Sequence, residues 1–250
     1  MAWYEYLLII GVGFLAAFLN TVGGGGSLFT VPILTFLGMP ITTANATARV
    51  AILAQNISAV SGFASKKVEL PLRYSLWLCG VSLIGGFLGS RLAAHVSDEL
   101  FRQLFVGVML FSTVLVILNP FRSNSRPERM HGWRQAMGVF LFFFIGIYGG
   151  FVQAGIGFLV IGALSLVHNL PLIKINYIKV FVAIVYTGVS VAVFAWEGKI
   201  EWFTGMILAI GHGLGGWYAS RWSVTASEVC IKRIMIGSVL LMAVKLWFFE

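Results

Sequence analysis

The sequence predicts an all-α integral membrane protein of two inverted-topology repeats, with short broken or re-entrant half-helices after Gly-rich breaks. Three observations lead to this fold class. The 250 residues are 59% hydrophobic and 10% charged, with a mean hydropathy of +0.93, whereas soluble domains carry about 25% charged residues. Ten apolar segments follow one another along the chain. The second half of the chain also repeats features of the first half at a nearly constant separation.

The ten apolar segments divide evenly between the two halves. They cover 3–22, 27–38, 43–65, 71–95 and 100–119 in the first half, and 133–153, 157–168, 175–196, 200–222 and 228–249 in the second. Most contain roughly 20 residues, which is enough to cross about 30 Å of hydrocarbon. The segments 27–38 and 157–168 are shorter, and each follows a glycine-rich break. We therefore expect two half-helices, which either cross the membrane or re-enter it.

Matched residues in the same order define the repeat. Pro40 and Pro171 are 131 residues apart, and so are Asn45 and Asn176. Further pairs lie within one residue of this separation: Phe63-Ala64 with Phe194-Ala195, Lys67-Val68-Glu69 with Lys199-Ile200-Glu201, and 85–91 with 215–221. Such matches predict a duplicated unit, with a first repeat at 1–120, an Arg-rich linker at 121–134 and a second repeat at 135–250. Because each repeat has an odd number of crossings, the second enters the membrane from the opposite side.

The basic residues of the loops predict the orientation. If the N-terminus lies outside, only Arg91, Arg102 and Lys199 fall outside. Eleven basic residues then fall inside: Lys66, Lys67, Arg73, Arg122, Arg126, Arg129, Arg134, Lys174, Arg221, Lys232 and Arg233. By the positive-inside rule, we expect a multi-pass protein of a bacterial inner membrane, with both termini outside and the linker in the cytoplasm. No basic stripe with interleaved aromatic residues occurs, which argues against nucleic-acid binding.

The glycine-rich breaks are the first candidate site. They comprise Gly23, Gly24, Gly25 and Gly26, followed by Ser27, and the later Gly155-Ile156-Gly157. Unpaired backbone groups in hydrocarbon cost roughly 2–7 kcal/mol each, so a break must line something. We expect the N–H groups at the half-helix starts to face a cavity, where the helix dipole favours an anion, and Ser27 to cap the first half-helix. The alternative, close helix packing, is the better interpretation for Gly85, Gly89, Gly146, Gly150, Gly211 and Gly215.

Two basic residues, Arg49 and Lys179, lie inside apolar segments at related positions of the two halves. A cation within a span is costly and marks a functional site, although both side chains could instead extend to the membrane surface. We expect them to supply positive charge to a substrate.

Further polar residues add candidate contacts. Four amide side chains are weaker candidates for contacts to the substrate: Asn20, Asn45, Gln153 and Asn176. Asn45 and Asn176 are either helix caps or polar contacts, and the sequence favours neither role over the other. His212 is a candidate proton relay, and its alternative role is a hydrogen bond to a neighbouring helix. Gln55 and Asn56 also need hydrogen-bond partners in a dry environment.

The acidic residues indicate the charge of the substrate. All nine lie at segment ends or in loops: Glu5, Glu69, Asp98, Glu99, Glu128, Glu197, Glu201, Glu228 and Glu250. A cation transporter normally places carboxylates inside the bundle, so the sequence favours an anion. No catalytic set of residues occurs, and we expect neither an enzyme, a cofactor nor a metal site. A homodimer is compatible with the glycine-rich faces, although no residue identifies an interface.

The stretch from Asn20 to Pro40 resembles the first repeat signature of the sulfite exporter TauE/SafE family, membrane transporters for sulfur-containing anions. Residues 44–47 fit the small-residue run that follows this signature. The second repeat departs from it, with Ile156 between two glycines and Ala163 where the first repeat has Pro32. The resemblance covers almost the whole chain and implies export of sulfite or a small organosulfonate such as sulfoacetate.

Together these observations predict a secondary transporter that binds a small anion near the membrane midplane and works by rocking one repeat against the other. An anion channel, or a transporter of thiosulfate or a short carboxylate, is the alternative.

Overall fold

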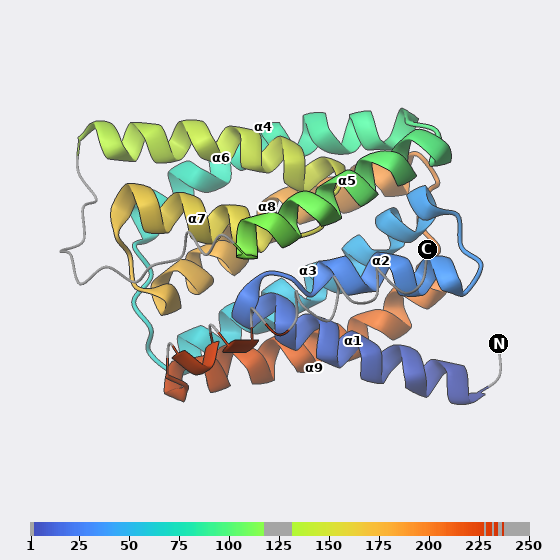
Figure 1. The fold of residues 1–250 in the computed structure, drawn as a ribbon, viewed down its shortest axis with the longest axis horizontal. Helices are drawn as coiled ribbons and strands as arrows, with labels where there is room; N and C mark the ends of the chain where they lie inside the picture. Colours follow the sequence, from blue (N-terminus) through green and yellow to red (C-terminus); the bar gives the residue numbers. More distant parts are fainter. Residues whose placement is uncertain (1–2, 118–131, 228, 232, 235–236, 238–250) are drawn as a thin grey trace.

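The computed structural model is a bundle of helices that lie along the long axis of the molecule (Figure 1). It describes residues 3–117, 132–227, 229–231, 233–234 and 237. Within these residues all regular structure is helical, which confirms the predicted all-α fold. Four of the described helices, α1, α4, α6 and α8, are long and apolar enough to cross a membrane. The protein is therefore an all-helical integral membrane protein.

The described helices follow nine of the ten predicted segments. The first half contains α1 (Trp3–Gly23), α2 (Ser27–Phe36), α3 (Ile41–Ser65), α4 (Leu72–His95) and α5 (Asp98–Ile117). The second half contains α6 (Trp133–Phe151), α7 (Ile156–His168), α8 (Leu172–Trp196) and α9 (Trp202–Thr225). The predicted linker 121–134 and the tenth segment, 228–249, lie largely outside the described residues.

Prolines set the starts of the two central helices. Pro40 and Pro171 occupy the N-cap positions of α3 and α8, with φ of −53° and −65°. Because proline has no N–H to donate and its ring clashes with a preceding helical turn, each helix begins at the next residue. The helices α3 and α8 thus begin two and three residues earlier than the predicted 43 and 175.

The short helices α2 and α7 double back along the helices that precede them. Thr30 of α2 lies 3.3 Å from the His212 ring, and the same ring lies beside Gly13 of α1. In the second half, His168 at the end of α7 lies beside Gly138 of α6. The pairs α1–α2 and α6–α7 are therefore helical hairpins, each bent at a glycine-rich break.

The first hairpin corrects one prediction at its bend. Gly26, not Ser27, occupies the N-cap position of α2, so the prediction that Ser27 caps this helix is wrong. A Cβ at Gly26 would lie 1.7 Å from the carbonyl oxygen of Ala16. The return of the chain against α1 therefore leaves no room for a capping side chain at this position.

The two sequence halves exchange one long helix each. The helix α4 packs against α6 and α8, whereas α9 packs against α1 and α3. We call these groups the first bundle (α1, α2, α3 and α9) and the second bundle (α6, α7, α8 and α4). Figure 1 shows α1 and α6 beginning at opposite ends of the molecule, as do α9 and α4. The packing units thus differ from the halves of the sequence. If one bundle moved as a rigid body, it would include one helix from the other sequence half.

Glycines allow the close contacts of the exchanged helices. A Cβ at Gly89 of α4 would lie 2.0 Å from the Ile147 carbonyl oxygen of α6. A Cβ at Gly211 of α9 would lie 2.1 Å from the Ile10 carbonyl oxygen of α1. The same crowding occurs at Gly85, Gly146, Gly150 and Gly215. The packing role predicted for these six glycines is confirmed.

Asp98 fastens the start of α5 to the start of α3. Its Oδ1 accepts hydrogen bonds from the backbone N–H and the hydroxyl group of Thr42, at 3.0 and 2.7 Å. These hydrogen bonds lower the pKa of the Asp98 carboxyl below its ordinary value of 3.8. A carboxylate with a lowered pKa stabilises the fold above that ordinary value, and the contribution is lost as the pH falls through the folded-state pKa.

We expect Asp98→Ala to destabilise the protein by about 1 kcal/mol at neutral pH, as for the loss of a helix cap. The difference from the wild type should shrink below about pH 3.8, where the carboxyl is neutral in the unfolded chain. Thermal unfolding in detergent at several pH values measures both effects. The matched control is Glu99→Ala, because the Glu99 carboxylate bonds only the exposed Gln103 side chain of its own helix among the described contacts. Equal losses in the two variants would contradict the role of Asp98.

Candidate functional site

The bends of the two hairpins meet in the interior of the molecule. A Cβ at Gly24 would lie 2.5 Å from the Cα atom of Gly157, and one at Gly157 would lie 2.2 Å from the Cα atom of Gly24. The backbones are therefore in direct contact, and we call this point the glycine crossing. Gly24 has a φ of +86°, and its N–H donates to the Asn20 carbonyl oxygen at 2.8 Å. This N–H is thus used within the chain.

Arg49 of α3 binds the C-terminal end of α6. Its guanidinium group donates to the carbonyl oxygens of Gly149, Gly150 and Phe151, the last two at 3.0 and 3.1 Å. Asn45, one turn earlier, donates to the Phe151 carbonyl oxygen at 3.2 Å and accepts from Arg49 at 3.4 Å. The Arg49 side chain is fully buried.

Lys179 of α8 binds the C-terminal end of α1 in the same manner. Its ammonium group donates to the carbonyl oxygens of Asn20 and Thr21 and to the Asn176 side-chain oxygen, each at 2.9 Å. Asn176 also donates to the Val22 carbonyl oxygen at 3.0 Å. Each sequence half thus supplies an asparagine and a cation to the broken helix of the other half.

A general property of helices explains these contacts. The last carbonyl groups of a helix lack partners within it and carry a partial negative charge. No water satisfies them inside a bilayer. The two cations therefore match the helix ends in charge and in hydrogen bonding. The alternative in which Arg49 and Lys179 extend to the surface is wrong, because they are 0% and 5% exposed. Asn45 and Asn176 are polar contacts of the breaks and do not cap their own helices.

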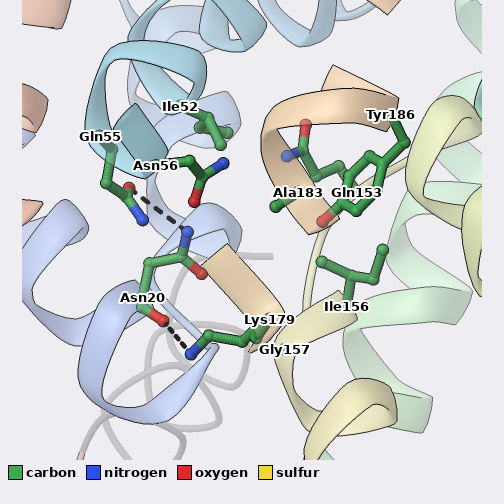
Figure 2. A pocket seen from close by; sticks show the side chains of 10 residues that line it. All are labelled: Asn20, Ile52, Gln55, Asn56, Gln153, Ile156, Gly157, Lys179, Ala183 and Tyr186. Atoms are coloured by element: carbon green, nitrogen blue, oxygen red, sulfur yellow. Dashed lines mark hydrogen bonds between the residues drawn. The ribbon is translucent and has the colours of Figure 1, made fainter. Parts of the chain in front are cut away.

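A small pocket lies beside the glycine crossing (Figure 2). Its volume of about 10 Å³ is room for about one water molecule. The helices α1, α3, α7 and α8 and the break before α7 all contribute to its wall: Asn20, Ile52, Gln55, Asn56, Gln153, Ile156, Gly157, Lys179, Ala183 and Tyr186. No acidic residue occurs among these lining residues.

The polar side chains of the pocket form two short chains of hydrogen bonds. Asn20 donates to the Gln55 side-chain oxygen at 3.3 Å, and Gln55 donates to the Thr21 hydroxyl at 3.3 Å. On the other side, Gln153 donates to the Thr187 hydroxyl at 3.1 Å. Among the described residues, the Asn56 side-chain nitrogen is buried without a partner. The pocket therefore contains an unused hydrogen-bond donor.

The pocket gathers only part of the predicted site. It brings together Asn20, Gln153, Gly157 and Lys179. It excludes several predicted residues, some of which lie at the breaks and others at the helix ends: Gly23, Gly24, Gly25, Gly26, Ser27, Asn45, Arg49, Gly155 and Asn176. The prediction named Gln55 and Asn56 only as polar groups in need of partners, and it missed Tyr186. Adjacent amides inside the apolar segment 43–65 were the available signal.

The buried histidines lie away from the pocket. The Nε2 atom of His212 lies 3.3 Å from the Thr30 hydroxyl, and its Nδ1 atom lies 3.2 Å from the Leu208 carbonyl oxygen. This geometry fits the alternative of a hydrogen bond to a neighbouring helix. His168 is equally buried, and its Nε2 atom lies 2.7 Å from the Tyr74 hydroxyl. His168, which the sequence analysis did not name, is thus a second deeply buried histidine.

Buried polar hairpins in an apolar helical bundle, with a pocket where they cross, are typical of membrane transporters. The chain matches the family described as "Sulfite exporter TauE/SafE" over residues 9–246 and belongs to that family, as the sequence resemblance predicted. The protein is thus a membrane transporter and not an enzyme.

Curated relatives carry the same general description. The chain is 26% identical over 250 residues to "Probable membrane transporter protein YfcA" of Escherichia coli (strain K12), covering 96% of this chain and 90% of the relative. It is 24% identical over 247 residues to a "Probable membrane transporter protein" of Haemophilus influenzae, covering 96% of both chains. No solved structure gives a significant match.

We expect Gly157→Ala to destabilise the protein by about 1–3 kcal/mol, because the new methyl group overlaps the backbone at Gly24. The matched control is Gly80→Ala on α4, where a Cβ has no neighbour within 4 Å. That change should be neutral or stabilising by up to about 1 kcal/mol, since alanine favours a helix. Thermal unfolding in detergent compares the two variants. A Gly157→Ala protein as stable as Gly80→Ala would mean that the hairpin bends are not in contact.

We expect Arg49→Met to lose more than about 3 kcal/mol of stability, because buried carbonyl groups at the end of α6 lose a charged donor. Arg91→Met is the control, since Arg91 forms a partly exposed ion pair with Glu197 at 2.6 Å, which is worth about 1 kcal/mol or less. Denaturant titration in detergent provides both values. A stable Arg49→Met protein that no longer binds anions would instead show that Arg49 serves the substrate.

Proposed function

We propose that the protein transports a small anion, sulfite or a small organosulfonate, through the pocket at the glycine crossing. The main support is the chemistry of the pocket wall. Lys179 and the N-terminal end of α7 bring positive charge, Asn56 offers a free donor, and no carboxylate lines the pocket. Such a wall attracts anions and disfavours cations. The family description as sulfite exporters supports the sulfur oxyanion in particular.

The transport step that fits this site is alternating access. A pocket of about 10 Å³ is smaller than any sulfur oxyanion, which has at least four heavy atoms, so the bundles have to separate before a substrate enters. Opposite directions of α1 and α6, and of α4 and α9, support an inverted repeat as the basis of this movement. The first and second bundles, with their exchanged helices, are the moving bodies in this proposal.

The orientation follows from the loop charges. We place both termini outside a bacterial inner membrane and the central linker in the cytoplasm. An inside-negative potential then drives an anion outward, by about 2.3 kcal/mol per charge for each 100 mV. Export therefore needs no coupled ion. A homodimer stays a prediction without an assigned interface, because the six packing glycines contact helices of the same chain.

We expect sulfite or sulfoacetate to raise the thermal stability of the purified protein, because a ligand stabilises the state that binds it. The panel also contains thiosulfate, sulfate, phosphate and short carboxylates. A response to carboxylates or thiosulfate alone would overturn the sulfite and sulfonate assignment and leave an anion transporter.

The same protein in liposomes distinguishes a transporter from a channel. We expect saturable sulfite flux that is accelerated by unlabelled sulfite on the opposite side of the membrane. Flux that rises linearly with concentration and shows no counterflow would favour an anion channel. Absence of both stabilisation and flux for all of these anions would overturn the proposed function.

A further inference from the structure

We propose that Asn56 is the substrate-contacting donor of the pocket, and that Lys179 acts there by its charge and not by a hydrogen bond. This inference rests on the proposed function, because it assumes that an anion occupies the pocket. It also assigns Arg49 to the end of α6 and not to the substrate.

Asn56 is placed to contact a ligand and has no other evident task. Its side chain is 3% exposed and belongs to the pocket wall. Figure 2 shows its amide pointing into the space between α3 and the residues from the second half. Among the described residues, its nitrogen atom has no hydrogen-bond partner. Buried donors normally have partners, so an unpartnered donor that faces a pocket indicates a ligand.

A comparison of the two halves shows that this donor occurs on one side of the pocket. Each half contains one amide–hydroxyl pair whose members are 34 residues apart, Gln55 with Thr21 and Gln153 with Thr187. The amide lies on the long helix in the first half and at the break in the second. At the separation of 131 residues that relates α3 to α8, Asn56 corresponds to Thr187, which accepts a hydrogen bond from Gln153 and does not line the pocket. The unused donor of Asn56 therefore has no counterpart in the pocket wall from the second half.

Lys179, the cation that lines the pocket, has committed its donors to neighbouring acceptors. The ammonium group of Lys179 has three protons, and it has three acceptors at 2.9 Å. It can attract an anion through its charge while its protons stay on the end of α1. Arg49 does not line the pocket: its two terminal nitrogens donate to three carbonyl oxygens at the end of α6, and its Nε atom, which has no partner among the described residues, is buried outside the pocket wall. A neutral amide donor beside a buried positive charge, with the start of α7 opposite, suits an oxyanion.

The test compares Asn56→Leu, which keeps the approximate size of the side chain and removes the donor, with the wild type. The matched control is Ser61→Leu, an exposed polar residue of the same helix whose hydroxyl bonds the Ser58 carbonyl oxygen. Sulfite affinity and thermal stability are measured on each purified full-length protein, and sulfite flux is measured in liposomes.

We expect Asn56→Leu to bind sulfite about 10- to 100-fold more weakly, which corresponds to one hydrogen bond to a charged group. Its melting temperature without sulfite should be unchanged or higher, because a buried unpaired amide is removed. Ser61→Leu should keep the affinity. A structural role would instead lower the melting temperature of Asn56→Leu.

Unchanged sulfite affinity in Asn56→Leu, with saturable binding by the wild type, would overturn this inference and leave the proposed function intact. Loss of both affinity and stability would also overturn it, in favour of a structural role. A wild-type protein that neither binds nor transports any tested anion would overturn the proposed function itself, and this inference with it.

Discussion

The arrangement of the site depends on how the ends of two broken helices are satisfied inside a bilayer. Both α1 and α6 stop in the protein interior, where water is absent and free carbonyl groups are costly. A single buried cation donates hydrogen bonds to the carbonyl groups of each end, Lys179 to those of α1 and Arg49 to those of α6. Because each cation comes from the other sequence half, the two hairpins are held in register with one another. The glycine crossing and the pocket follow from that register.

Much of the fold could be predicted because local chemistry determined it. Glycine runs and the prolines at 40 and 171 act through backbone geometry, so the breaks and the helix starts lay close to where the sequence indicated. The exchange of α4 and α9 between the bundles could not be predicted in this way. Apolar periodicity shows that a helix is buried or faces lipid, but it does not specify the partner. The glycine pairs of α4 and α9 revealed close packing without revealing against which helix.

The site was predictable in its composition and less so in its contacts. An arginine and a lysine inside apolar segments need partners wherever they are buried, and both Arg49 and Lys179 are buried. Their hydrogen bonds to the ends of α6 and α1 could not be predicted, because carbonyl groups at a helix end leave no mark in a sequence. The direct backbone contact between Gly24 and Gly157 could not be predicted either, because the two glycines lie in different halves of the sequence. The neutral amides Gln55 and Asn56 were not predicted to contact a substrate, because a charged residue inside a membrane segment is the stronger indication of a functional site.

The two cation caps also constrain how the molecule can move. Arg49 belongs to the first bundle and its acceptors to the second, while Lys179 joins the bundles in the opposite direction. Any sliding of one bundle past the other would stretch both sets of bonds at once and uncover carbonyl groups in hydrocarbon. Rotation about an axis near the caps and the glycine crossing would change these distances least. For the proposed alternating access, the contacts therefore favour a pivot at the crossing, beside the pocket, with the largest displacements at the two membrane surfaces.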